Sequence, residues 1–596
     1  MSSKNNFGPR RPASKPKNKK SASRLYTPED LRSLYGLSPS VIERYFPEPF
    51  TRKYSRGGNG GSSPAWTSSQ VTRALEHPKI RLAMDRVKQK QLQAAEQEEK
   101  IRQFLLGFDV EKLRQEAETL ARRFVLHVGP TNSGKTYQAL QALKQARTGV
   151  YLGPLRLLAL EMYETMNRDG VPCSLLTGEE SVPCPGALHT ASTIELADFG
   201  TRYDVAVIDE AQMIADPFRG DKWFRALYCL RADEIHVCLA PEARDLIIRM
   251  LENFGAPYTV MEHKRLAPLS YTGVFENLKD VQPGDALIVF SRKAVLAVSA
   301  ELERAGKHAS VIYGALPPVS RREEVRRFSE HETEVVVATD AIGMGISLPI
   351  RRVIFCETSK FDGKDRRPLR VGEIRQIAGR AGRFGIYDRG EVLTMTDPER
   401  VRDAMLRDEP RKNRLTLPFP EEALDSEYPL DRLMIEWNRL PKTEGFTRVD
   451  MSDAILLYSY IKPYAKKIDR KLLFRLITCP VDVKDESMIL YWLKCCLRMT
   501  ANQPLPEPVS GIGTLEECES RYKELDIRHQ LLRQIGIEEN RMDEKLELCD
   551  LINRFLKERK DEYLRRCRQC GRILPPTHPY GLCERCHAIN PFVRTR

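Results

Sequence analysis

The chain has 596 residues, 41% of them hydrophobic and 30% charged, a composition typical of a globular protein with several domains rather than a single core. No apolar run approaches the roughly 18 to 20 residues of a membrane-spanning helix, so the sequence predicts no membrane partner. The net charge of +13 is concentrated at the ends, where residues 1–24 carry +8 and residues 563–596 carry +6. Basic ends favour a phosphate-backbone partner, although solvated tails give the same pattern.

The first part of the chain is predicted to be a tail followed by short helices. Residues 1–24 are basic, acid-free and nearly devoid of apolar side chains, which predicts a disordered tail. Residues 25–123 form a predicted helical region, since Pro28 and Pro39 each follow a capping side chain at a position suited to the first helical turn. Within this region the Gly/Ser-rich run 56–64 is typical of a flexible linker.

From Phe124 onward short apolar strands alternate with helical stretches, which predicts an α/β protein with parallel sheets. The expected strands read FVLHV, GVYLG, YDVAVID, EIHVCLA, DALIVF, HASVIY, EVVVA and RRVIFC. The pattern restarts near residue 268, so we expect one α/β domain at 124–267 and a second at 268–415. Helical patterns such as RKLLFRLI then dominate, which predicts a helical domain at 416–562.

A phosphate-binding loop follows the strand FVLHV. The segment GPTNSGKT has the spacing of Gly, four residues and Gly-Lys-Thr before a helix, a pattern that a chain of this length shows by chance roughly 2% of the time. The amides of such a loop surround phosphates, its lysine reaches the β- and γ-phosphates, and its hydroxyl binds magnesium. The sequence therefore predicts that ATP with Mg²⁺ is bound by Gly129, Pro130, Thr131, Asn132, Ser133, Gly134, Lys135 and Thr136.

A pair of acids ends the strand in VAVIDEAQ, at the edge of the sheet where sites in parallel α/β proteins usually lie. We expect Asp209 to hold magnesium and Glu210 to orient the attacking water. A strand that ends in two acids is by itself more often a turn or a helix cap. Its position 74 residues after Lys135 makes the catalytic interpretation the stronger one.

Kinases share the phosphate loop and the acidic pair, so only the sequence of the second α/β domain can distinguish between these classes of nucleotide-binding protein. There the chain reads QIAGRAGRFG, in which Gln376 precedes two arginines flanked by glycines. Arg380 and Arg383 are candidates for arginine fingers aimed at a γ-phosphate on the facing domain, where such groups stabilise the charge of the transition state. A Gly/Arg turn that binds nothing is the alternative, and the other motifs disfavour it.

Seven segments together resemble the superfamily 2 helicases, and in detail the RNA helicase of the mitochondrial degradosome and its bacterial relatives, the Suv-three type. They read GPTNSGKT, GPLRLLALE, LLTGEE, VIDEAQM, IYGALPP, ATDAIGMGISL and QIAGRAGRFG. The resemblance covers residues 124–400 strongly and the helical region to about residue 500 loosely. It implies two tandem RecA-like domains and an ATP-dependent motor that moves 3′ to 5′ on single-stranded RNA and unwinds duplexes in RNA turnover, in cooperation with an exoribonuclease.

The resemblance also implies roles for matching positions. Lys135, Asp209, Glu210, Gln376, Arg380 and Arg383 match the hydrolysis motifs, while Asp340 and Gly345 match a motif near the ribose and γ-phosphate. Contacts to the RNA backbone are implied for Pro154, Arg156, Thr177, Thr193, Ser291 and Thr339. Phosphate contacts would make the motor largely independent of sequence. Two features depart from the family: APEA replaces the usual Ser-Ala-Thr, and no adenine-reading motif precedes the phosphate loop.

Four cysteines near the C-terminus form two CxxC pairs separated by twelve residues. Two such pairs suit a closed tetrahedral site, which predicts structural Zn²⁺ bound by Cys567, Cys570, Cys583 and Cys586. Free or redox-active thiols are the alternative. No secretory segment is evident, so the cysteines indicate a reduced compartment. The zinc knuckle at 563–596 favours a bacterial relative in the cytoplasm, with the mitochondrial matrix as the alternative.

Two other functions stay open from the sequence. A DNA helicase or translocase would carry the same motifs, because phosphate contacts are common to both nucleic acids and only a contact to the 2′-hydroxyl distinguishes RNA. A non-catalytic scaffold would bind nucleic acid through the basic ends and the zinc knuckle. The intact Lys135, Asp209 and Glu210 argue against such a scaffold.

Overall fold

The computed structural model describes residues 25–49, 51–54, 62–108, 117, 119–343, 348–363, 365–537, 539, 541–558, 563–564, 566–574 and 581–589. The predicted basic tail 1–24, most of the predicted linker, Gly345 and the last seven residues lie outside these ranges. The chain divides into two compact units, residues 1–104 and residues 105–596. None of the helices in the described part of the chain is long and apolar enough to cross a membrane.

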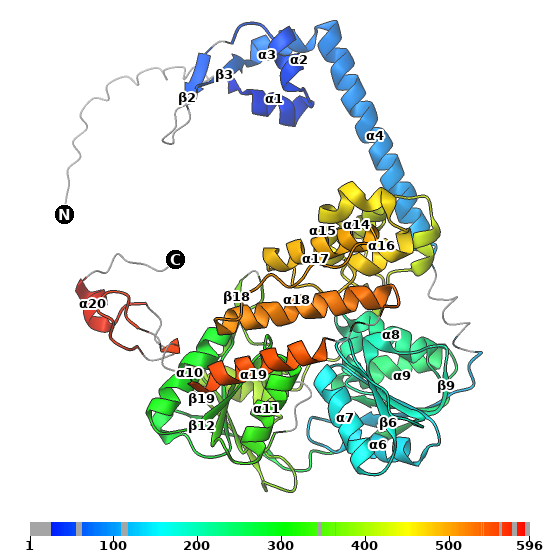
Figure 1. The fold of residues 1–596 in the computed structure, drawn as a ribbon. Helices are drawn as coiled ribbons and strands as arrows, with labels where there is room; N and C mark the ends of the chain where they lie inside the picture. The colour runs from blue at the N-terminus through cyan, green and yellow to red at the C-terminus, as the bar shows by residue number, and fades with distance from the viewer. Residues whose placement is uncertain are drawn as a thin grey trace, which may run out of the picture. The chain divides into compact units, whose positions relative to one another are not determined.

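The first unit contains short helices and a small antiparallel sheet (Figure 1). Thr27 caps the first helix with a reciprocal hydrogen-bond pair to Asp30, as the sequence predicted for a helix that starts at a proline. The core of this unit surrounds Leu31 and Trp66, both buried. Its elements are β1 (Leu25–Tyr26), α1 (Pro28–Tyr35), α2 (Pro39–Tyr45), β2 (Thr51–Tyr54), β3 (Ser62–Thr67), α3 (Ser68–Leu75) and most of α4 (Pro78–Leu106).

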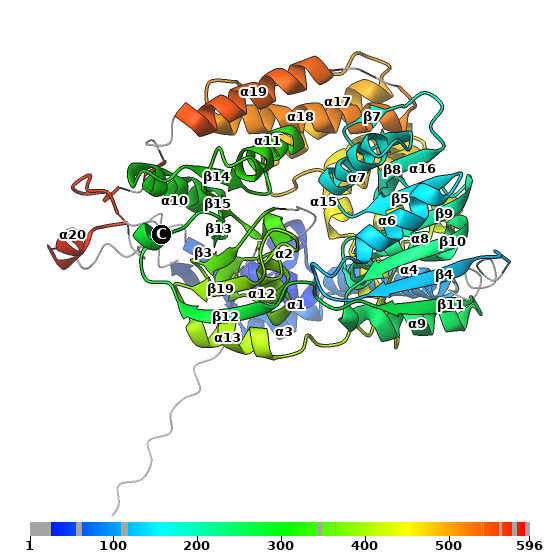
Figure 2. The same cartoon turned by 90° about the horizontal axis from the view of Figure 1, so that it is seen from below.

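The second unit begins with an eight-stranded sheet, which with its helices we call the first α/β domain (Figure 2). All neighbouring strands are parallel except the last pair. In spatial order they are β11 (Tyr258–Glu262), β4 (Arg123–Val128), β10 (Arg231–Leu239), β9 (Arg202–Ile208), β5 (Gly149–Gly153), β8 (His189–Thr193), β6 (Cys173–Leu176) and β7 (Ser181–Val182). One face is covered by α8 (Gly220–Cys229) and α9 (Arg244–Asn253), and the other by α6 (Lys135–Gln145) and α7 (Arg156–Arg168).

A six-stranded sheet, entirely parallel, forms the second α/β domain. Its strands in spatial order are β12 (Leu269–Val274), β19 (Gly390–Thr394), β16 (Arg352–Phe355), β13 (Asp285–Ile288), β15 (Val335–Ala338) and β14 (Ala309–Ile312). Its helices are α10 (Arg292–Arg304), α11 (Pro318–Ser329), α12 (Val371–Ala378) and α13 (Pro398–Leu406). Two successive parallel sheets with helices on both faces confirm the predicted fold class.

The region after residue 415 is mostly helical, but its parts pack against different domains. Leu415, in the short strand β20 (Leu415–Leu417), lies in the core of the first α/β domain, and β20 pairs with β21 (Phe446–Arg448). The last two long helices are built into the core of the second α/β domain instead. The helices of this region are α14 (Leu430–Arg439), α15 (Ser452–Ile461), α16 (Arg470–Ile477), α17 (Glu486–Thr500), α18 (Leu515–Gln534) and α19 (Met542–Glu558). Helical periodicity predicts the helices but not the domain on which each apolar face packs.

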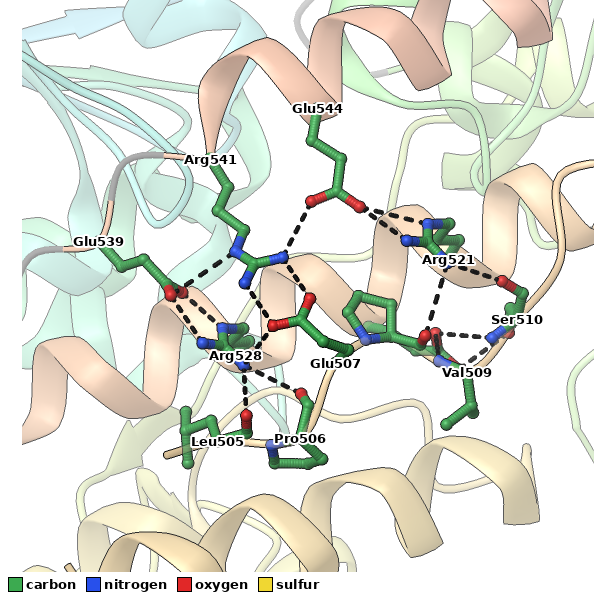
Figure 3. A network of polar contacts seen from close by, with 12 residues as sticks. Leu505, Pro506, Glu507, Val509, Ser510, Arg521, Arg528, Glu539, Arg541 and Glu544 are labelled. Carbon is green, nitrogen blue, oxygen red and sulfur yellow. Dashed lines mark hydrogen bonds and ion pairs between the residues drawn. The ribbon is translucent and has the colours of Figure 1, made fainter. Parts of the chain in front are cut away.

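The connection between α17 and α18 has no regular secondary structure and is held by arginines (Figure 3). Arg528 of α18 donates hydrogen bonds to the carbonyl oxygens of Leu505 and Pro506, each at 2.9 Å. Arg541 forms two hydrogen bonds with the carboxylate of Glu507. The bonds from Arg528 satisfy backbone carbonyls that no helix or sheet uses, and Arg541 holds the Glu507 side chain, so the two arginines fix the path of the chain into α18.

Candidate nucleotide site between the two sheets

The predicted phosphate loop connects β4 to α6. Asn132 and Gly134 adopt left-handed backbone conformations, with φ of 61° and 79°. A side chain at Gly129 would place its Cβ 2.5 Å from the carbonyl oxygen of His263, so only glycine fits there. The ammonium of Lys135 donates hydrogen bonds to the carbonyl oxygens of Gly129 and Pro130, each at 2.7 Å. The lysine thus lies across its own loop, where a phosphate group could replace these two acceptors.

Asp209 is buried at the end of β9 and is held by three side chains. The hydroxyl of Thr136 donates to its carboxylate at 3.2 Å, and the hydroxyl of Tyr151 donates at 2.9 Å. The indole of Trp223 donates to its backbone carbonyl at 2.9 Å. Burial and the neighbouring Glu210 raise the pKa of Asp209 to about 6. A hydroxyl beside a carboxylate offers the oxygen ligands that Mg²⁺ prefers, so these residues fit the predicted ion.

Glu210 is linked to the APEA segment, whose role the sequence left unassigned. Its backbone has a φ of 51°, in the left-handed region that non-glycine residues rarely adopt. The amide of Gln212 donates to the Glu210 carboxylate, and the Gln212 carbonyl oxygen accepts a hydrogen bond from the backbone N–H of Ala240 at 3.1 Å. A backbone group therefore makes this connection, which explains why no particular side chain identified it in the sequence.

The Gly/Arg turn of the second α/β domain lies against the phosphate loop of the first. The side-chain amide of Asn132 donates to the carbonyl oxygen of Gly382 at 2.6 Å. Arg380 follows α12 and donates to the carbonyl oxygen of Gly343 at 2.6 Å. Two segments about 250 residues apart in the sequence are thereby joined directly.

Electrostatics also connect the arginines of this turn to acids of the first α/β domain. Burial lowers the pKa of Arg380, and the carboxylate of Glu210 opposes that shift. Burial raises the pKa of Glu161 on α7, and the charges of Arg383 and Arg380 oppose it. Gln376 lies on α12 next to Gly343, since a Cβ added at Gly343 would be 3.8 Å from the Cγ of Gln376. The predicted hydrolysis residues of both domains are therefore close together, and Glu161 joins them as an acid that the sequence did not single out.

The six residues expected to contact RNA all follow or end parallel strands, at the carboxyl edges of the two sheets. The side chains of Pro154, Thr177, Thr193 and Thr339 are buried. Ser291 is exposed and caps α10 by accepting from the amide of Ala294 at 3.1 Å. Arg156 pairs with Glu179 and lies 3.4 Å from Asp526 of α18. Of these six residues, Arg156 and Ser291 are thus the two whose side chains are not buried. Asp340 forms an ion pair with Lys360 at 2.7 Å, and Gly345 lies outside the described residues.

Three histidines form a hydrogen-bonded chain beside the phosphate loop. His127 of β4 lies between His236 and His263, with nitrogen–nitrogen distances of 2.8 Å and 3.1 Å. His236 also contacts the carboxylate of Glu234 at 2.7 Å. Burial and the two neighbouring imidazoles lower the pKa of His127 to about 4, and burial lowers the pKa of the other two as well. The three imidazoles of this histidine chain are consequently neutral at pH 7.

The four predicted zinc ligands converge near the C-terminus. The sulfur atoms of Cys567, Cys570, Cys583 and Cys586 all lie within 4.8 Å of one another. Cys570 Sγ and Cys583 Sγ are 3.7 Å apart, close to the edge of about 3.8 Å expected for a tetrahedron of thiolates around Zn²⁺. The cluster therefore has the donor set and spacing of a structural metal site.

Comparisons with known proteins agree with this geometry. Residues 111–263 match the DEXQ-box helicase domain of Suv3, and residues 272–385 match the helicase conserved C-terminal domain. The chain contains a Suv3-type helicase core. The predicted family resemblance is thereby confirmed for the two α/β domains.

Several curated relatives share this core. The chain is 41% identical over 382 residues to the mitochondrial DExH-box ATP-dependent RNA helicase DExH16 of Arabidopsis thaliana, covering 61% of this chain and 66% of that protein. It is 44% identical over 293 residues to the mitochondrial ATP-dependent RNA helicase SUPV3L1 of Homo sapiens, covering 47% and 37%. The chain spans about half the length of the curated relatives it matches.

The relatives bear on location as well. They are named as mitochondrial, which supports the mitochondrial alternative and gives no support to the expected bacterial cytoplasm. Among solved structures, Dbp5 of S. cerevisiae bound to RNA and ADP BeF3 is 15% identical, with a TM-score of 0.38 over 59% of this chain and 93% of Dbp5. A similarity this weak supports no structural argument.

Proposed function

We propose that the protein is an ATP-dependent RNA helicase that hydrolyses ATP between its two α/β domains, steps along single-stranded RNA and displaces the paired strand. The observation that carries the proposal is the contact between the two halves of the site. The phosphate loop of the first domain and the Gly/Arg turn of the second are joined through Asn132 and Gly382. A kinase-like nucleotide site would need no such second domain.

The residues of the site suit hydrolysis as follows. Lys135 exchanges the carbonyl oxygens of Gly129 and Pro130 for the β- and γ-phosphates. Thr136 and Asp209 would hold Mg²⁺, and the ion would neutralise phosphate charge. Glu210 orients the attacking water, because Gln212 fixes its carboxylate.

The arginines of the second domain complete the site. Arg380 and Arg383 bring positive charge to the transition state, a contribution of about 10³- to 10⁵-fold in rate for arginine fingers. They reach the nucleotide only while the domains are together. Hydrolysis and phosphate release would then let the domains separate, and this movement would drive the step along RNA.

The choice of RNA rests on the names of the relatives, since the contacts expected at the strand ends are to phosphate and common to both nucleic acids. The test compares ATP hydrolysis with single-stranded RNA, with single-stranded DNA and with neither. We expect stimulation by RNA, together with displacement of RNA duplexes that carry a 3′ overhang. Stimulation and unwinding by DNA alone would overturn the RNA assignment in favour of a DNA helicase.

Lys135→Ala tests the site itself. The variant should lose RNA-stimulated hydrolysis because it removes the ammonium proposed to bind the β- and γ-phosphates. Lys144→Ala is the matched control, since Lys144 lies on the same helix and forms an ion pair with Asp169, away from the phosphate loop. Unchanged hydrolysis in Lys135→Ala would refute the site. RNA binding by a wild-type protein that hydrolyses no ATP would favour the scaffold.

Three further assignments extend this proposal. The cysteine cluster holds Zn²⁺ as a structural ion, supported by its donor set and spacing. Movement from 3′ to 5′ and cooperation with an exoribonuclease rest on the family resemblance alone. A mitochondrial location rests on the names of the relatives.

A further inference from the structure

The linker between the two α/β domains carries an arginine that contacts both of them. Arg265 follows β11 and precedes β12. Its guanidinium donates to the carbonyl oxygen of Thr131 at 3.0 Å, to that of Gly379 at 2.9 Å and to that of Ala381. Its Nε donates to the carbonyl oxygen of Ala267 at 2.7 Å, which fixes the side chain against its own linker.

The three carbonyl oxygens bound by the guanidinium group all belong to segments of the proposed ATP site. Gly379 and Ala381 are the residues immediately before and after Arg380. Thr131 lies in the phosphate loop. Arg265 therefore binds the backbone on both sides of Arg380, the proposed arginine finger. It connects this part of the turn to the loop that would hold the phosphates.

The fit depends on close approach of the two segments. A side chain at Gly379 would place its Cβ 3.0 Å from Thr131 Cβ, so a larger residue would separate the turn from the loop. Asn132 adds a parallel connection through the carbonyl oxygen of Gly382. Groups from the linker and the phosphate loop thus bind three of the carbonyl oxygens in the turn.

The charge of Arg265 is not compensated by an acid. Within the described ranges no carboxylate pairs with it. Burial and the nearby Arg380 lower its pKa to about 10, so it stays protonated at pH 7. A guanidinium with carbonyl partners alone carries an uncompensated charge into the site, which favours anionic phosphates nearby.

We infer that Arg265 is a positioning residue that sets Arg380 in register with the phosphate loop. The inference rests on the proposed ATPase and names a further residue of that site. Two of the bonds from its head are to the turn and one is to the loop, so we expect Arg265 to stay with the turn when the domains separate. Each closure would then re-form the bond to Thr131 and return Arg380 to the same place.

The test measures hydrolysis and nucleotide binding in the full-length chain. Arg265→Ala should lower RNA-stimulated kcat by about 10- to 100-fold, because a displacement of about 1 Å costs up to that much in a positioned site. The affinity for a fluorescent ADP analogue should stay near wild type, and any fall in the melting temperature should leave the protein folded at the assay temperature. Arg265→Lys should not restore the rate, since an ammonium lacks the planar fork that reaches divergent carbonyl oxygens.

Three controls separate positioning from general stability. Lys264→Ala removes the adjacent, exposed linker cation and should leave the rate unchanged. Guanidinium ion at millimolar concentration should restore part of the rate in Arg265→Ala without raising that of wild type. Asn132→Ala combined with Arg265→Ala should show a non-additive loss, because both groups hold one turn.

Two outcomes would overturn the inference while wild type stays active. One is a rate in Arg265→Ala equal to that of wild type. The other is a loss of nucleotide affinity or of melting temperature that accounts for the whole fall in rate. Absence of hydrolysis in the wild-type protein would refute the proposed function instead, so the two failures are distinguishable.

Discussion

Acidification should loosen the sheet of the first α/β domain, because its histidine chain is held neutral. His127 is 1% exposed and lies between two other imidazoles. A proton on His127 would make both of its nitrogens donors and bring positive charge next to His236 and His263. Burial and the two neighbouring imidazoles oppose this charge, so the folded sheet resists protonation.

The size of the effect follows from linkage. The pKa of His127 is about 4 in the folded protein and 6.5 in the unfolded chain, so between these values the unfolded chain binds the additional proton. Stability therefore decreases as the pH falls through 6.5 and continues to decrease until about pH 4. At about 1.4 kcal/mol per pKa unit, this one histidine costs about 2 kcal/mol at pH 5. The lowered pKa values of His236 and His263 act in the same direction.

Hydrogen exchange of the β4 amides, corrected for intrinsic rates, measures this stability locally in a multidomain chain. In wild type the opening free energy of β4 should fall between pH 7 and pH 5. His127→Gln keeps a donor and an acceptor between the two neighbours but does not titrate, so its slope should be shallower by about one proton. His308→Gln changes a histidine that is 67% exposed and should leave the slope as in wild type. Equal slopes in wild type and His127→Gln would refute the neutral chain.

Three other perturbations have defined outcomes. Gly220→Ala would place a Cβ 2.4 Å from the carbonyl oxygen of Ile214, so a strain of about 1 to 3 kcal/mol should lower the melting temperature. The nucleotide affinity of the protein that remains folded should be unchanged. Arg528→Ala leaves the carboxylate of Glu539 with Arg541 as its remaining ion-pair partner, and urea unfolding should show a loss of about 1 to 3 kcal/mol. A chelator should remove one zinc ion per chain, which a colorimetric dye detects, and Cys586→Ser should bind zinc more weakly. In both cases basal ATPase should stay within about twofold of wild type if the zinc knuckle does not take part in hydrolysis.

The sequence predicted the strands that contain a long apolar run and left out the shorter or more polar ones. The segment FVLHV is apolar enough to be recognised and forms most of β4. In contrast β8, which reads HTAST, lies between β5 and β6 with most of its residues buried. Its polar side chains are satisfied by neighbouring elements, as when His189 contacts the carbonyl oxygen of Leu143 at 3.0 Å. Tertiary contacts of this kind leave no signal in local hydropathy.

The candidate site divides in a similar way. Lys135 and Asp209 could be predicted because phosphate and magnesium chemistry demands those side chains at fixed places after a strand. Tyr151 and Arg265 could not, since Tyr151 acts through a hydrogen bond to Asp209 and Arg265 through backbone carbonyl oxygens. Any segment of the chain supplies a carbonyl oxygen, so the partners of Arg265 have no residue signature.

The two faces of α18 explain how the C-terminal region connects the two α/β domains. Leu515 and Leu525 are buried in the core of the second α/β domain, so the helix moves with that domain. Toward the first domain its contacts are polar: the Tyr522 hydroxyl donates to Glu179 at 2.9 Å and Arg533 donates to the carbonyl oxygen of Thr177 at 2.9 Å.

These polar contacts fall on the LLTGEE segment, one of those expected to touch RNA, and Figure 1 shows α18 lying across both α/β domains. Apolar burial holds α18 on the second domain, whereas its two hydrogen bonds to the first domain can be exchanged for bonds to water when the domains separate. Each separation of the domains would have to break the bonds at Thr177 and Glu179, so that α18 carries the movement made at the nucleotide directly to the expected RNA-contacting edge.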